Sequence, residues 1–138
     1  MRVIVSACLL GINCKYNGGN NYNQKVADYL RDKEYLVICP ERMAGLSIPR
    51  KAIEIRNGKV VDEDGIDITN SINQANCDLL KLIDTFHPSL AILKAKSPSC
   101  GYKKIYDGSF THALIQGNGK SAELIHQKGI KILTEEDL

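Results

Sequence analysis

Three of the five cysteines stand at or shortly after the ends of apolar segments that are typical of buried strands. These are Cys8, Cys39 and Cys100. Thiols can bind soft metals or act as nucleophiles, so their placement matters for chemistry. Open parallel sheets bind ligands outside the carboxyl ends of their strands, because each strand delivers its following loop to that edge. We therefore expect the three thiols to converge at one sheet edge.

The segments around these cysteines support a binding role. Residues 8–20, 39–50 and 96–101 contain glycine, proline, serine and asparagine at many positions. Glycine lets the backbone approach a bound group closely, and functional residues concentrate in such loops. The alternative is that each cysteine is a small buried hydrophobic residue, which is the commonest role of a free thiol. The shared position of three cysteines favours a site.

The spacing of the thiols limits which metal they could bind. A structural zinc site usually includes a short Cys-x₂₋₄-Cys pair, and no such pair exists in this sequence. A catalytic zinc with three thiolates and an iron–sulfur cluster both remain open. Four lysines near Cys100 could offset the charge of an anionic cluster, and they stand at positions 94, 96, 103 and 104.

The other two cysteines differ in their expected roles. Cys14 lies six residues after Cys8 and could be a fourth ligand, a reserve thiol or a packing residue. Cys77 falls off the apolar stripe of a predicted helix and away from the loop edge, so we expect it to be structural. Among the histidines, only His112 is expected near the site.

The pattern of apolar residues predicts the elements that position these side chains. Near-continuous apolar runs, typical of parallel strands covered on both faces, occur at residues 2–7, 35–39, 90–94 and 130–133. Helical periodicity predicts helices over residues 23–34, 67–86 and 118–128. Asn57-Gly58 between apolar flanks predicts a hairpin over residues 53–61. Together these favour an α/β fold: one domain over residues 1–138, with a mostly parallel, Rossmann-like sheet flanked by helices and a small β-hairpin insertion.

Composition excludes several classes of protein. The chain has 138 residues, 25% of them charged, and a net charge of +2. These values are typical of a globular protein, and the small charge gives no indication of a nucleic acid or membrane partner. No apolar segment is long enough to span a bilayer, and the N-terminus lacks the pattern of a signal peptide, so we expect a cytoplasmic protein with reduced thiols.

Several motifs together resemble the thiouracil desulfidase family. They are Cys8-Leu9-Leu10-Gly11 with Cys14 and Tyr16-Asn17-Gly18, Cys39-Pro40-Glu41, Gly45-Leu46 with Pro49-Arg50, Lys96-Ser97-Pro98-Ser99-Cys100-Gly101 and Tyr106-Asp107-Gly108. They follow one another in order over nearly the whole chain, which makes the resemblance specific.

The resemblance implies a cofactor and a reaction. It implies a [4Fe-4S] cluster held by Cys8, Cys39 and Cys100, whose open iron binds the sulfur of a thiolated pyrimidine. Water then replaces that sulfur without net redox change. Glu41 and Ser97 match the positions implied for proton transfer and substrate activation. Without the resemblance, Glu41 could equally be an ion-pair partner of Arg42 or Arg50, and Ser97 a turn residue.

The sequence departs from the family pattern at two places. Asn17 stands where the family usually has aspartate, which removes a carboxylate near the expected site, and Ala44 replaces a glycine.

Two other functions compete with the desulfidase acting on a small pyrimidine. One is desulfuration of thiouridine in tRNA, motivated by the lysines near Cys100. The other is a non-catalytic protein that stores a cluster or hydrosulfide.

Overall fold

The computed structural model describes residues 1–138, and its centre is a four-stranded parallel sheet with strand order β2-β1-β5-β8. The strands are β1 (Arg2–Ser6), β2 (Glu34–Ile38), β5 (Leu90–Leu93) and β8 (Lys131–Thr134). All four agree with the predicted segments to within one or two residues at each end. The parallel pairing of β1 with β2 and with β5 places the carboxyl ends of these strands on the same side.

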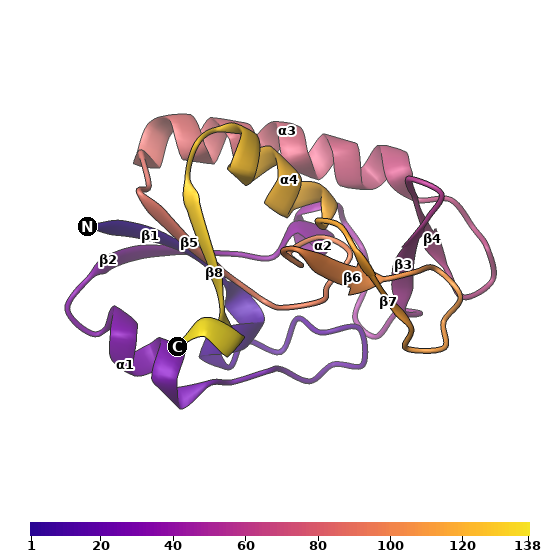
Figure 1. The fold of residues 1–138 in the computed structure, drawn as a ribbon, viewed down its shortest axis with the longest axis horizontal. Coiled ribbons are helices and arrows are strands. Elements are labelled where there is room, and N and C mark those ends of the chain that lie inside the picture. The colour runs from indigo at the N-terminus through magenta and orange to yellow at the C-terminus, as the bar shows by residue number, and fades with distance from the viewer.

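Helices cover both faces of the sheet (Figure 1). The helices α3 (Thr69–Phe86) and α4 (Lys120–Gln127) lie together on one face, and α1 (Gln24–Leu30) lies on the other. Ile4 of β1 packs in a core with Leu79 and Ile125, whereas its neighbours along β1 pack against α1. Successive side chains of a strand point to opposite faces, so a run without polar residues becomes buried on both sides.

Two small two-stranded antiparallel sheets accompany the central parallel sheet. The first consists of β3 (Ile53–Arg56) and β4 (Lys59–Asp62) and confirms the predicted hairpin. The second consists of β6 (Lys104–Tyr106) and β7 (Leu114–Gln116) and was not predicted. Its strands have three residues each, too few for a period-2 pattern to emerge from the sequence. A one-turn helix, α2 (Pro40–Met43), was also not predicted.

Two local signals for helix ends are confirmed, although α1 ends at Leu30 and not at residue 34. The Asn23 side chain accepts a hydrogen bond from the Val26 amide at 3.1 Å and caps α1. Gly129, just after α4, has a φ of +77°, the left-handed conformation expected of a helix-ending glycine. No helix is long and apolar enough to cross a membrane.

Two expectations about burial are wrong. β2 is the edge of the sheet, and its Tyr35 and Val37 are exposed, so this strand is not covered on both faces. Leu82 shares the apolar stripe of α3 in the sequence but is 37% exposed. It lies at the border of the buried face that Leu79 and Ile83 occupy.

The buried stripe of α3 predicts a contrast between two leucines on the same helix. Leu79→Ala removes fully buried methyl groups from the core and is expected to lower the free energy of unfolding by about 2–5 kcal/mol. Leu82→Ala, the matched control, is expected to change it by less than about 1 kcal/mol. Urea denaturation measures both. Equal losses for the two variants would contradict the packing described above.

Candidate functional site

Four of the five cysteines line one cavity of about 380 Å³ at the carboxyl ends of β1, β2 and β5. Cys8 lies in a 3₁₀ turn that follows β1, and Cys39 immediately precedes α2. Cys100 lies in the turn after β5 and is buried. The structure therefore brings together the three thiols that the strand pattern placed at one edge. Cys77 is exposed on α3 and does not line the cavity.

Cys14 is the fourth thiol of this cavity. It is buried, and its thiol interacts with that of Cys39. This interaction is the main cause that lowers the pKa of Cys39 below the ordinary value of a thiol, with a smaller contribution from the backbone amide of Arg42. An interaction with the Cys14 thiol stabilises the ionised form of Cys39, so Cys14 keeps its proton and Cys39 more readily becomes a thiolate.

Burial opposes ionisation of the other two thiols, Cys8 and Cys100. Burial raises the pKa of Cys100 to about 12, although hydrogen bonds with Ser6 and Ser99 oppose the effect. Burial also raises the pKa of Cys8, with a hydrogen bond from Asn21 acting in the opposite direction. Metal binding by these thiols would release their protons, because the thiolate is the ligand.

Glu41 is held rigidly at the wall of the cavity. It follows Cys39 by two residues in the first turn of α2, and its Oε1 pairs with Nη2 of Arg50 at 2.9 Å. Nη2 of Arg50 also donates to the carbonyl of Cys14 at 2.9 Å. The Oε2 of Glu41 accepts a hydrogen bond from Ser99 Oγ at 3.1 Å. The sequence left open a pairing of Glu41 with Arg42 or Arg50, and the structure has Arg50.

Ser97 organises the turn that carries Cys100. Its Oγ accepts hydrogen bonds from the amides of Ser99 and Cys100 at 3.2 and 3.0 Å, and it lies 3.0 Å from Ser99 Oγ. Ser97 therefore has the turn role considered from the sequence, and it also lines the cavity. Ser99 connects the hydroxyl of Ser97 to the carboxylate of Glu41, a link that the sequence did not indicate.

The beginning of α4 anchors the same turn. The amides of Lys120 and Ser121 donate to the carbonyls of Pro98 and Ser99, each at 2.9 Å. The amides that begin a helix lack partners within it, and here the turn supplies them. A Cβ at Gly119 would lie 2.5 Å from the Ser99 carbonyl, so only glycine permits this approach.

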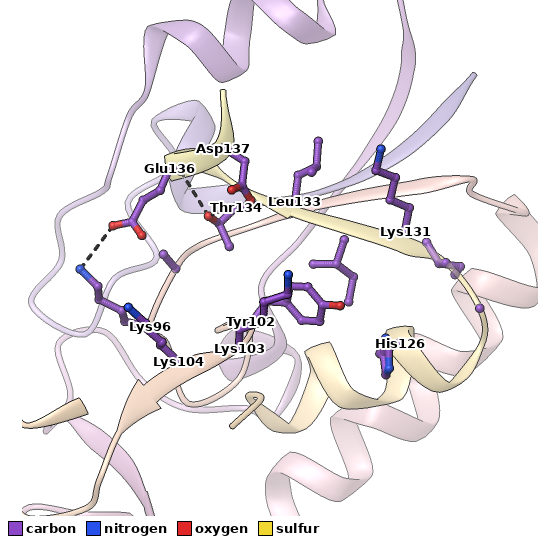
Figure 2. A pocket seen from close by; sticks show the side chains of 14 residues that line it. Lys96, Tyr102, Lys103, Lys104, His126, Lys131, Leu133, Thr134, Glu136 and Asp137 are labelled. Carbon is purple, nitrogen blue, oxygen red and sulfur yellow. Dashed lines mark hydrogen bonds and ion pairs between the residues drawn. The ribbon is translucent and has the colours of Figure 1, made fainter. Parts of the chain in front are cut away.

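The lysines near Cys100 in sequence do not all lie near it in space. Lys94 lines the cysteine cavity and pairs with Glu135 at 2.8 Å. Lys96, Lys103 and Lys104 instead line a second cavity of about 710 Å³ along the edge strand β8, which Figure 2 shows. Of the four lysines expected to offset charge near Cys100, only Lys94 therefore lines the cysteine cavity. Lys96 pairs with Glu136, and Lys103 and Lys104 lie where the chain leaves Cys100 to form β6.

The lining of the cysteine cavity also includes His112, Glu54 and Tyr106. His112 lies there as expected, and Glu54 and Tyr106 were not predicted as site residues. Asn17, which replaces the family's aspartate, does not line the cavity; its Oδ1 accepts a hydrogen bond from the Gly19 amide at 2.9 Å in an exposed turn.

The donor set suits a soft, multi-atom group. No three cysteine, histidine, aspartate or glutamate side chains surround a position for a single metal ion. Thiolates are the preferred ligands of iron–sulfur clusters. The cavity of about 380 Å³ is lined by four cysteines, a donor set that matches such a cluster.

Comparisons with known proteins give a family model and two similar proteins. A family model described as 2-thiouracil desulfurase matches residues 3–137. The uncharacterized protein YbbK of Bacillus subtilis (strain 168) is 34% identical over 146 residues, covering 99% of this chain and 97% of YbbK. Among solved structures, the [4Fe-4S]-dependent thiouracil desulfidase TudS superposes with a TM-score of 0.92 at 35% identity, covering 99% of this chain and 92% of that one.

The contacts of Arg50 predict a large stability contribution. Its side chain is 8% exposed, and Arg50→Met would leave the Glu41 carboxylate and the Cys14 carbonyl without their partner. We expect a loss of about 3–5 kcal/mol in the free energy of unfolding of the metal-free protein.

Arg31→Met is the matched control, because the pair of Arg31 with Asp28 is exposed and is expected to contribute at most about 0.5 kcal/mol. Urea denaturation of both variants measures the difference. A loss from Arg50→Met as small as that of the control would contradict a structural role for the buried pair.

Proposed function

This chain belongs to the 2-thiouracil desulfurase family, and from that premise we propose that it is a [4Fe-4S]-dependent desulfidase. Its reaction replaces the sulfur of a small thiolated pyrimidine with oxygen from water. The observation that carries the proposal is the cavity that Cys8, Cys39 and Cys100 line together with a fixed carboxylate, Glu41.

We assign the three cysteines that follow strands as the cluster ligands. Bound by three thiolates, the cluster would supply one iron without a protein ligand, a Lewis acid for the sulfur of the substrate. Cys14 serves in this proposal as a hydrogen-bond donor to Cys39, because its buried thiol interacts with that of Cys39. Lys94, Arg50 and Lys15 line the cavity and offset the negative charge of the thiolates.

Glu41 is the proposed general base. Hydrolysis of C=S to C=O adds the oxygen of water to the ring carbon and releases hydrosulfide, so no electrons are transferred. The water must lose a proton as its oxygen attacks, and a positioned carboxylate takes up such protons effectively. The contacts with Arg50 and Ser99 hold both oxygens of Glu41 in fixed directions. Ser97 and Ser99 line the same wall and can orient the substrate's polar edge.

One observation favours a second candidate, desulfuration of thiouridine within tRNA. The lysine-lined cavity of Figure 2 adjoins the cysteine cavity, and Ala95 lines both. A nucleic acid chain with one base in the cysteine cavity could place its phosphates near those lysines.

Comparing turnover of free 2-thiouracil, a thiouridine nucleoside and thiolated tRNA distinguishes the small-molecule desulfidase from the tRNA desulfidase. We expect turnover of the small substrates, and activity confined to tRNA would overturn that expectation.

The cofactor assignment predicts the iron content of cysteine variants. Protein purified without oxygen is expected to be brown and to contain about four iron atoms per chain. Serine at position 8, 39 or 100 removes a thiolate ligand and is expected to abolish cluster binding, whereas Cys77→Ser leaves it intact because Cys77 is exposed on α3. Iron analysis and visible absorption measure this. Iron-free wild-type protein after anaerobic reconstitution would contradict the proposal.

The proton-transfer role predicts the effect of Glu41→Gln. The amide keeps a similar shape but cannot take a proton, so kcat is expected to fall about 10²–10⁴-fold. Glu34→Gln, at the exposed start of β2 and outside the cavity, is the control. Sulfide release from 2-thiouracil measures both variants. If both variants keep their iron, unchanged kcat in Glu41→Gln would refute the role of Glu41.

The alternative of a non-catalytic protein that stores a cluster or hydrosulfide has its own outcome. Iron binding by the wild type with no sulfide release from any thiolated substrate would favour such a carrier.

A further inference from the structure

Glu54 is the second carboxylate of the cysteine cavity, and it differs from Glu41 in its partners. It lies on β3, is only 7% exposed and forms no ion pair. Its Oε1 accepts hydrogen bonds from two backbone amides, those of Gly108 at 3.0 Å and Phe110 at 3.1 Å. A buried carboxylate that accepts from the backbone fixes the segment that donates to it.

Arg56 holds the same turn from the same face of β3. It follows Glu54 by two residues, the period at which strand side chains share a face. Its Nε donates to the carbonyl of Gly108 at 2.9 Å, and its guanidinium lies 5.8 Å from the centre of the Phe110 ring. A Cβ at Gly108 would lie 2.7–2.8 Å from the Cα and Cβ of Arg56. The backbone of the turn at Gly108 therefore lies directly against the backbone of β3.

The turn carries two rings to the cavity. Tyr106 ends β6 and His112 precedes β7, and both line the cavity. Their ring centres are 5.8 Å apart with an interplanar angle of 77°. Phe110 and His112 have φ values of +59° and +64°, conformations that non-glycine residues keep only where their surroundings hold them.

We infer that Glu54 is a positioning residue that holds the turn of residues 107–112 against β3, and that the Tyr106–His112 pair placed in this way is the wall against which the planar ring of the substrate packs. A thiolated pyrimidine has two flat faces, which aromatic rings contact well, and polar edges. The identity of the ligand rests on the proposed function, whereas the role of Glu54 in fixing the turn does not.

A pair of variants at position 54 separates positioning from proton transfer. Glu54→Gln keeps an oxygen that can accept both amide hydrogen bonds, and we expect kcat and KM for 2-thiouracil to stay within about two-fold of the wild type. Glu54→Leu has a similar size but no acceptor, which leaves both amides unpaired. We expect its KM to rise about ten-fold or more.

Asp62→Leu is the matched control. Asp62 also accepts hydrogen bonds from two backbone amides, those of Asp64 at 2.9 Å and Ile66 at 3.0 Å, but neither Asp62 nor these partners line the cavity. Its KM is expected to equal that of the wild type. A loss of kcat at unchanged KM in Glu54→Gln would overturn the inference, because it would make Glu54 a proton carrier.

Two measurements do not depend on turnover. Hydrogen exchange of the Gly108 and Phe110 amides is expected to be slow in the wild type and in Glu54→Gln, and fast in Glu54→Leu. This comparison tests Glu54 even if the wild type releases no sulfide, so a failure of the proposed function can be recognised separately. Equal exchange in all three proteins would overturn the positioning role.

Calorimetric binding of uracil, the unreactive product, to the cluster-loaded protein tests the ring wall. Tyr106→Leu removes one ring without touching the contacts of Glu54, and we expect it to weaken binding about ten-fold. Because this variant does not alter Glu54, it keeps the inference testable if Glu54→Leu does not fold. Unchanged affinity for uracil would overturn the assignment of the wall.

Discussion

The parallel pairing of β1 with its two neighbours is the constraint on which the site depends. The register sets Ser6 of β1 beside Ile38 of β2, and Val5 beside Ile92 of β5. Three loops that are distant in sequence therefore leave the sheet at one edge, each with a cysteine. The burial of β1 and β5 on both faces makes this register costly to change, because a shift by one residue would exchange the sides of all their side chains. The core of the sheet thus determines where the thiols meet.

Each cysteine-bearing segment is then held by its own hydrogen bonds. The carbonyl of Cys8 accepts from the Asn21 amide at 2.9 Å, and the carbonyl of Cys39 accepts from the Met43 amide at 2.9 Å. The turn before Cys100 accepts from the first amides of α4. Backbone groups buried without partners cost free energy, so pairing them in the protein itself makes the loops well defined. Because these hydrogen bonds hold the cysteine-bearing loops in place, we expect the site to keep its shape without a bound group.

Sequence reasoning reached the parts of the site that follow from regular topology. The convergence of three thiols was predictable, since a parallel sheet turns distant positions into neighbours. The contact between Cys14 and Cys39 was not, because it depends on the path of an irregular loop that no periodicity describes. Glu54 was missed for a related reason. Its role appears only when the turn at Gly108 folds onto β3, a contact between residues 54 positions apart. Motif resemblance indicated Glu41 and Ser97, but not Ser99, which joins them.

The thiols and the turn of residues 107–112 are held by different parts of the structure, so the two can change independently during evolution. The cysteine turns depend on the central sheet, α2 and α4, whereas Tyr106 ends β6 and His112 lies on a turn that Glu54 and Arg56 of β3 hold. Insertions or exchanges in this turn would alter which molecules fit the cavity without moving a sulfur atom. One fold can therefore keep its inorganic chemistry constant over evolution while its choice of organic ligand drifts.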